Sequence, residues 1–170
     1  KIASSDITDS YLQKYISKEK KPIILSTGMS DKKDIKNCIK NFKTRNLVIL
    51  HCVSLYPCEK KQANLNRIIS LKENFNYAIG YSDHCTGINA AITSIFLGAK
   101  VIEKHFTFNK KKIGLDHKLS ADYNDLKAIC DFAKDYQYLF GRKKINPSPY
   151  EKSFRKLFRK GIYFRKNVKR

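Results

Sequence analysis

Short apolar segments recur along the chain, and each of them ends in polar residues. They span residues 1–4, 22–26, 47–52, 78–82 and 101–105. The segments are rich in Ile and Val and are bounded by turn-forming residues, a pattern that is typical of buried parallel strands. The sequence therefore predicts five parallel strands.

Helical patterns fill the intervals between these segments. One predicted helix follows Ser30, a suitable N-cap, and a second lies between Gly87 and Gly98. A third, longer helix is predicted from about Asp122 to Gly141. Strands that alternate with helices at short spacing indicate an α/β fold with a parallel sheet. Periodicity alone leaves open whether this sheet curls into a barrel or forms an open, doubly wound sheet.

The regular pattern ends after Gly141. Residues 146–149 contain two prolines and are interpreted as a linker, and the basic segment beyond them as a tail or the start of a further part. Because the chain begins without an initiator Met and ends in a basic run, we interpret it as a fragment of a longer protein.

Composition and charge narrow the class of protein. The 170 residues suffice for one domain, and they contain neither an apolar run long enough to span a membrane nor a signal-peptide pattern. The five cysteines are scattered and lack a C-x-x-C pair, which argues against a disulfide framework and for a cytoplasmic location. The net charge of +20 is spread along the chain, so we interpret it as solvated surface rather than as a nucleic-acid or membrane surface.

Polar side chains gather where the predicted strands end. In parallel α/β folds the active site forms at the C-terminal ends of the strands. The residues at these ends are Ser4, Ser5, Asp6, Ser26, Thr27, Gly28, His51, Cys52, Ser54, Ser82, Asp83, His84, His105 and Thr107. The serines could cap the helices that follow, or they could donate hydrogen bonds to a phosphate group.

Two histidines are the sharper candidates. Strand alternation places Ser82 with His84, and Glu103 with His105, on one side of their strands. If these strands are neighbours, about 4.8 Å apart, both imidazoles can reach one metal ion. Two imidazoles with room for water and substrate suit a catalytic divalent cation better than a closed structural zinc site. His51 is out of step with its neighbours, and we assign it a structural role.

Six motifs in order resemble those of a known family. They are KIASSD (1–6), KPIILSTGM (21–29), HCVSLYP (51–57), GYSDH (80–84), GAKVIEKHFT (98–107) and DHK (116–118). Each is weakly specific alone, but their order and spacing closely resemble the N-acetylneuraminate (sialic acid) synthase family from residue 1 to about residue 141.

The resemblance implies a fold and a domain organisation. The expected fold is a partial TIM (β/α)₈ barrel, of which this chain holds strands four to eight with their helices. Residues 1–141 would be the C-terminal part of the synthase barrel, and residues 142–170 a linker towards a missing antifreeze-like domain. In the family that domain reaches across a dimer and contributes an Arg to the partner's site. We therefore expect a domain-swapped homodimer for the parent enzyme and no activity from this fragment alone.

The resemblance also assigns roles to residues by position. Contacts to phosphoenolpyruvate match Lys1, Ser4, Ser26, Ser54 and Ser82. His84 and His105 match the ligands of a divalent metal, usually Mn²⁺ or Mg²⁺. Tyr56 and Asp116 match contacts to the acceptor sugar, and Asp6 matches an acidic residue that handles protons.

The implied reaction joins phosphoenolpyruvate to an N-acetylated amino sugar of the N-acetylmannosamine type, giving a sialic acid-type nonulosonate and phosphate. The family usually has Pro where this chain has Leu115, and a more Pro-rich loop at residues 58–61, so the identity of the sugar stays open. The DHK run favours the neuraminate and legionaminate branches over the pseudaminate branch. The alternatives are a legionaminate or other nonulosonate synthase, such as a spore-coat enzyme, and a non-catalytic basic α/β module that binds nucleic acid.

Overall fold

The chain divides into two compact units, Lys1–Leu139 and Phe140–Arg170. The computed structural model describes residues 1–19, 21–42, 44, 46–162 and 164–167.

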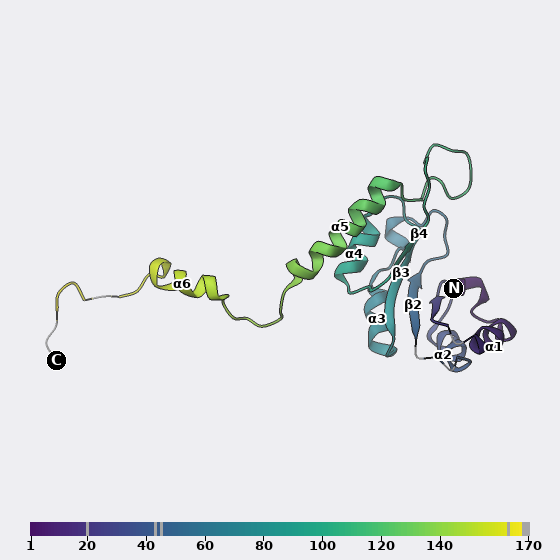
Figure 1. The fold of residues 1–170 in the computed structure, drawn as a ribbon, viewed down its shortest axis with the longest axis horizontal. Helices are drawn as coiled ribbons and strands as arrows, with labels where there is room; N and C mark the ends of the chain where they lie inside the picture. Colours follow the sequence, from purple (N-terminus) through teal and green to yellow (C-terminus); the bar gives the residue numbers. More distant parts are fainter. Residues whose placement is uncertain (20, 43, 45, 163, 168–170) are drawn as a thin grey trace. The chain divides into compact units, whose positions relative to one another are not determined.

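A parallel sheet lies at the centre of the first unit (Figure 1). Its strands are β1 (Ile23–Ser26), β2 (Leu47–Cys52), β3 (Ala78–Asp83) and β4 (Ile102–Lys104), arranged in sequential order. Every neighbouring pair is parallel, and the sheet curls into a half-barrel. The unbroken order confirms the predicted α/β fold with parallel strands, and the described strands show none of the order reversal that marks a doubly wound sheet.

The predicted strand over residues 1–4 is wrong in extent. Ile2 forms one isolated parallel bridge with Leu25, and the chain then turns into a short 3-10 helix, η1 (Ser4–Asp6). Ser and Asp side chains hydrogen-bond to nearby backbone and compete with a strand ladder, which accounts for the early turn.

Among the described residues of this unit, five helices precede, connect or follow these strands. They are α1 (Ser10–Lys18), α2 (Lys32–Lys40), α3 (Asn66–Asn74), α4 (Asn89–Phe96) and α5 (Tyr123–Phe140), with a second 3-10 helix, η2 (Lys60–Gln62), before α3. The N-cap of α2 is Asp31 rather than the predicted Ser30, because the Asp31 carboxylate accepts hydrogen bonds from the backbone of Lys33 and Asp34. Gly98 and Gly141 adopt positive φ angles at the ends of α4 and α5, as a C-terminal glycine cap requires.

The main core fills the space between the sheet and its helices. Leu25 and Ile49 on the strands and Ile68 on α3 are fully buried. Burial of one such side chain contributes about 1.5–3 kcal/mol. A smaller cluster joins Ala91 and Ile95 of α4 to Ile129 of α5. These contacts hold the strand ends at a common edge of the sheet.

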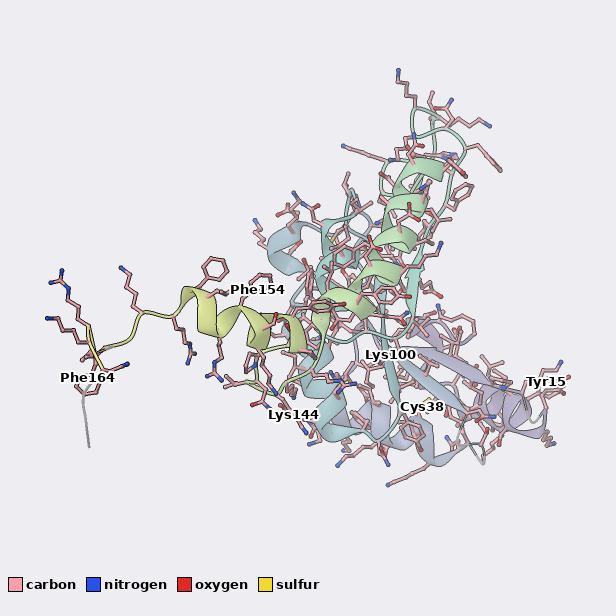
Figure 2. All side chains as sticks on the ribbon, turned by 60° about the vertical axis from the view of Figure 1, so that its left-hand side comes forward. Tyr15, Cys38, Lys100, Lys144, Phe154 and Phe164 are labelled. Carbon is pink, nitrogen blue, oxygen red and sulfur yellow. The ribbon has the colours of Figure 1, made fainter. Side chains whose placement is uncertain are left out.

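The second unit contains one helix, α6 (Pro149–Phe158), among its described residues. The Ser148 hydroxyl and the Glu151 carboxylate form a capping box at its start. The segment interpreted as a linker therefore ends as the first turn of a helix. Apolar side chains of α6 are exposed, and Phe154 projects from the ribbon (Figure 2). In the part of the chain that the structure describes, no helix combines the length and the apolar character needed to cross a membrane.

Candidate active site

A cavity of about 300 Å³ opens at the C-terminal ends of the four strands. Its lining residues are Lys1, Ala3, Ser4, Ser26, Cys52, Tyr56, Ser82, His84, Glu103, Lys104 and His105. Seven of the ten predicted site residues are in this lining. Residues as far apart in the sequence as Lys1 and His105 thus meet at one edge of the sheet.

Strand register explains which side chains reach the cavity. Cys52 lies opposite Ser82, and Ser82 lies opposite Glu103, so one row of three residues crosses β2, β3 and β4. Side chains two residues further on point to the same side of a strand. That alternation carries His84 and His105 into the same cavity.

Serine hydroxyls form one wall. The Ser26 hydroxyl is buried and has no hydrogen-bond partner among the described residues. Next to it, Ser4 accepts a hydrogen bond of 2.9 Å from the backbone N–H of Gly28. A side chain at position 28 would collide with the hydroxyls of Ser4 and Ser54, so glycine permits these groups to approach. A buried hydroxyl without a protein partner is costly unless a ligand satisfies it.

Glu103 is the main charged residue that the sequence analysis left without a role. Its carboxylate accepts hydrogen bonds of 2.6 Å from Lys1 and 2.7 Å from the Ser82 hydroxyl. Burial raises the pKa of Glu103, but these two donors outweigh burial and the net pKa lies below its ordinary value. The residue is therefore an ionised carboxylate that orients both Lys1 and Ser82.

The two predicted metal ligands lie side by side. The ring centroids of His84 and His105 are 5.5 Å apart. Nδ1 of His84 lies 2.8 Å from the Val53 carbonyl oxygen, so Nδ1 carries the proton and Nε2 of the neutral ring carries the lone pair. This backbone contact is the kind that orients a histidine ligand.

Cys52 contacts His84 from the neighbouring strand. The Cys52 sulfur lies 3.9 Å from Nδ1 of His84. Burial raises the pKa of the Cys52 thiol, but hydrogen bonds from His84, Ser4 and Ser82 outweigh it, and the net pKa is lowered. For His84, burial lowers the pKa, while the contacts with Cys52 and Val53 raise it above its ordinary value.

The groups predicted to contact a sugar lie next to the two imidazoles. The Tyr56 ring lies 4.1 Å from the His84 ring, centroid to centroid, and meets the His105 ring edge-on at 5.9 Å. The Asp116 carboxylate lies 3.7 Å from Nδ1 of His105. Asp116 therefore adjoins the cavity without lining it.

The remaining predicted residues lie outside the lining. Ser54 is close to Ser4 at Gly28, and Asp6 accepts a 3.1 Å hydrogen bond from the Ser5 hydroxyl at the end of η1. Cys52 and Glu103 line the cavity although neither was assigned a role. For Glu103 a signal existed, because alternation already placed it on the same side as His105.

The donor set fits a divalent cation with open coordination positions. Two imidazoles converge from adjacent strand ends, and at least one offers a ring nitrogen in the neutral form. Among the described residues, no group of three or more His, Cys, Asp or Glu side chains is arranged to hold a metal ion. Such a site would keep positions for substrate and water, which is typical of catalytic rather than structural sites.

A second cavity, of about 320 Å³, lies between α2 and α3 and is lined in part by Ile35, Leu71 and Phe75. Its buried polar groups already have backbone partners. The Thr27 hydroxyl donates to the Leu50 carbonyl at 2.9 Å, and Nε2 of His51 lies 2.8 Å from the Ala63 carbonyl. We therefore assign this cavity to packing, and His51 to the structural role expected for it.

The profile of the NeuB family matches residues 1–145. The chain belongs to the NeuB family. An uncharacterized protein of Methanocaldococcus jannaschii, MJ1065, is 42% identical over all of this chain and 51% of its own length. The N,N'-diacetyllegionaminic acid synthase of Campylobacter jejuni is 37% identical over all of this chain and 52% of its own length.

Among solved structures, the N-acetylneuraminic acid (sialic acid) synthetase of Leptospira borgpetersenii, in complex with citrate, aligns with a TM-score of 0.83. It is 32% identical, and the alignment covers 94% of this chain and 58% of that one. This NeuB chain thus spans about half the length of the curated relatives that it matches.

Proposed function

We propose that this NeuB chain provides part of the active site of a synthase that condenses phosphoenolpyruvate with an N-acetylated amino sugar. The observation that carries the proposal is one cavity in which a serine-rich wall faces two adjacent imidazoles. A phosphorylated substrate and a metal-activated carbonyl require this combination of groups.

The serine wall supports binding of the phosphate. The unpartnered hydroxyl of Ser26 would donate to a phosphate oxygen, with Ser4 and Ser82 in the same lining and Ser54 next to Ser4 at Gly28. Lys1 adds a positive charge, which Glu103 holds in place through its hydrogen bonds of 2.6 Å. Charge-assisted hydrogen bonds of this type are shorter and stronger than neutral ones.

His84 and His105 would hold a divalent metal, Mn²⁺ or Mg²⁺, which when bound supplies Lewis acidity towards the aldehyde of the open-chain sugar. The Val53 carbonyl keeps the His84 ring in the tautomer that can bind a metal. Tyr56 and Asp116 flank the two imidazoles and are proposed to orient the sugar against them.

The reaction forms one carbon–carbon bond. The enol carbon of phosphoenolpyruvate attacks the aldehyde carbon, water adds to the cationic centre that results, and phosphate leaves by C–O cleavage. Of the two water protons, one ends on the former aldehyde oxygen and the other on the released phosphate. Asp6 is proposed to accept the proton from the adding water, because it follows Ser4 in η1 at the edge of the cavity.

The finer features of the parent protein are part of the same proposal. The strands would correspond to the later strands of a (β/α)₈ barrel, with residues 142–170 leading to an antifreeze-like domain. We propose a cytosolic, domain-swapped homodimer as the active form, with a neuraminate- or legionaminate-type sugar as the acceptor. The five free cysteines accord with a reducing compartment.

Calorimetric titration of the chain with phosphoenolpyruvate in the presence of Mn²⁺ tests the proposed binding. We expect binding that inorganic phosphate competes away and that Ser26→Ala weakens. Absence of phosphoenolpyruvate binding would contradict the proposed function. Mass spectrometry of mixtures that also contain N-acetylmannosamine should detect no nonulosonate with this chain alone. Product formation would show that the earlier barrel strands and the antifreeze-like domain are not required for the reaction.

A further inference from the structure

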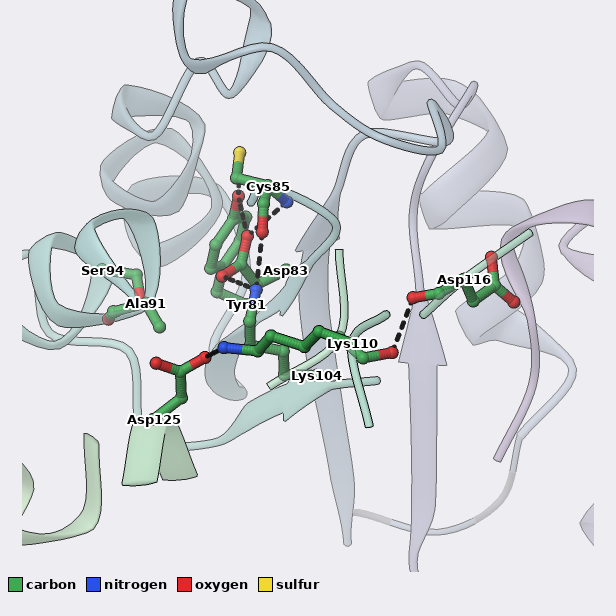
Figure 3. Close-up of polar contacts among 10 residues, drawn as sticks. Tyr81, Asp83, Cys85, Ala91, Ser94, Lys104, Lys110, Asp116 and Asp125 are labelled. Carbon is green, nitrogen blue, oxygen red and sulfur yellow. Dashed lines mark hydrogen bonds and ion pairs between the residues drawn. The ribbon is translucent and has the colours of Figure 1, made fainter. Parts of the chain in front are cut away.

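A buried ion pair joins the two residues that precede the imidazoles in the sequence. Asp83 and Lys104 immediately precede His84 and His105 in the sequence. Nζ of Lys104 lies 2.8 Å from Oδ2 of Asp83, and the side chains are only 3% and 0% exposed (Figure 3). No other ion pair in the described part of the chain is buried on both sides to this degree.

Every polar atom of the pair faces a defined partner. Oδ1 of Asp83 accepts hydrogen bonds from the Cys85 N–H at 2.8 Å and from the Tyr81 hydroxyl at 3.2 Å. Lys104 also donates to the Cys85 carbonyl oxygen at 2.7 Å. Lys104 on β4 therefore bonds to both neighbours of His84, namely the Asp83 carboxylate and the Cys85 backbone carbonyl (Figure 3).

The position of the pair in the sheet gives it a specific consequence. Asp83 and Lys104 are the last paired positions of the β3–β4 ladder. Beyond them, the His84 carbonyl accepts from Cys58 and the His105 carbonyl accepts from Ala121, so the two histidine backbones are tied to different segments. The ion pair is the final connection between the two strands before the imidazoles.

Stability alone does not account for such a pair. Two charges removed from water lose hydration energy, and well-packed apolar residues of similar volume are often as stable as a buried ion pair or more stable. The directional hydrogen bonds of Lys104 with Asp83 and Cys85 can set the distance between the ends of β3 and β4. Apolar packing lacks this directionality.

We propose that Asp83 and Lys104 are positioning residues, which fix the spacing of His84 and His105 for a shared divalent cation. The inference rests on the proposed function, since it requires that the two imidazoles bind one ion. Changes to groups that orient metal ligands typically weaken metal affinity by about 10- to 100-fold.

The test compares metal affinity with stability in the 170-residue chain. Mn²⁺ affinity is measured by electron paramagnetic resonance and the unfolding midpoint by circular dichroism, for the wild type, Lys104→Met, Asp83→Asn and the double variant. Each single variant leaves one buried charge without its partner, so we expect a lower midpoint and weaker binding. The double variant removes both charges, so its midpoint should recover while its Mn²⁺ affinity stays at least tenfold below wild type.

Ser94→Ala is the matched control. Ser94 is fully buried in α4, and its hydroxyl donates to the Ala91 carbonyl at 2.6 Å, apart from the cavity (Figure 3). It should lower the midpoint and leave Mn²⁺ affinity unchanged. Wild-type Mn²⁺ affinity in the folded double variant would overturn the positioning role alone. No Mn²⁺ binding by the wild type would overturn the proposed function and this inference together.

Discussion

The two sides of the same strand ends differ in how their polar groups are satisfied. On the cavity side, the Ser26 hydroxyl has no partner among the described residues, and Lys1 and Glu103 remain 36% and 38% exposed. On the helix side, Asp83 and Lys104 are buried and bonded to each other, and Lys104 also borders the cavity. Residues that alternate one by one along β3 and β4 thus belong to two different polar layers.

The helix-side layer extends across the sheet. His51 on β2 is bonded to the Ala63 carbonyl and stacks on Tyr81 of β3, with ring centroids 5.5 Å apart. Burial and the nearby Asp83 carboxylate raise the pKa of Tyr81 well above its ordinary value, so this hydroxyl stays a hydrogen-bond donor. The cavity-side layer therefore has polar groups free to bind a ligand, and the helix-side layer has polar groups bonded to each other that fix the positions of the cavity-side residues.

The largest expected effect on stability belongs to the helix-side layer. Tyr81→Ala removes a fully buried ring and should lower the free energy of unfolding by about 3–5 kcal/mol, measured by urea denaturation. Tyr81→Phe keeps the ring and loses only the hydroxyl contacts with Asp83 and Cys85, so it should cost about 1 kcal/mol. Equal losses of unfolding free energy in Tyr81→Ala and Tyr81→Phe would contradict a stabilising role for the buried ring.

On the cavity side, the largest effect should be on metal binding. His84→Ala or His105→Ala should weaken Mn²⁺ binding at least 100-fold, which corresponds to about 2.7 kcal/mol. His84→Ala also removes contacts with Val53, Cys52 and Tyr56, so its free energy of unfolding should fall by about 1–3 kcal/mol. His105→Ala should cost less, because the His105 side chain is 38% exposed. His117→Ala is the control, since Nδ1 of His117 contacts the Thr107 hydroxyl outside the cavity. Unchanged affinity in both test variants would remove them as ligands.

A smaller effect is expected at the serine wall. Ser26→Ala should weaken phosphoenolpyruvate binding by about tenfold, or about 1.4 kcal/mol, through loss of a hydrogen bond to a charged group. Because the hydroxyl has no partner among the described residues, the free energy of unfolding should stay the same or rise. Calorimetry measures the phosphoenolpyruvate affinity, and urea denaturation measures the free energy of unfolding. A clear loss of stability with unchanged phosphoenolpyruvate binding would instead assign Ser26 a structural role.

The smallest effect should come from a surface pair that belongs to neither layer. Lys127 and Asp131 form an exposed ion pair one turn apart on α5. Lys127→Ala should change neither ligand binding nor the unfolding midpoint measurably, because water and salt screen such pairs. A large shift in either quantity would show that effects at the strand ends are not specific.

Much of this division could be predicted from the sequence, because strand alternation is a local property. The period of two alone places Ser82 with His84, and Glu103 with His105, on one side of their strands. The parallel direction of the strands also followed from their apolar runs and the helices between them. Both predictions depend on residues close together in the chain.

The features that the sequence pattern does not predict depend on partners that are distant in sequence or on competing hydrogen bonds. Lys1 meets Glu103 across 102 positions, and no local pattern indicates that contact. The choice of Asp31 over Ser30 as N-cap and the early end of the first strand were decided by competing backbone hydrogen bonds. Asp6 and Asp116 keep their proposed roles as predictions, since both lie outside the cavity lining.

The most direct test of the central claim follows the imidazole nitrogens themselves. Long-range ¹⁵N–¹H spectra of the chain, titrated with Zn²⁺ as a diamagnetic probe, resolve each histidine separately. We predict that the ring nitrogens of His84 and His105 shift together and saturate at one ion per chain, while those of His51 and His117 stay unchanged. A shift of only one of the two, or saturation of each by a separate ion, would contradict a shared metal site at these strand ends.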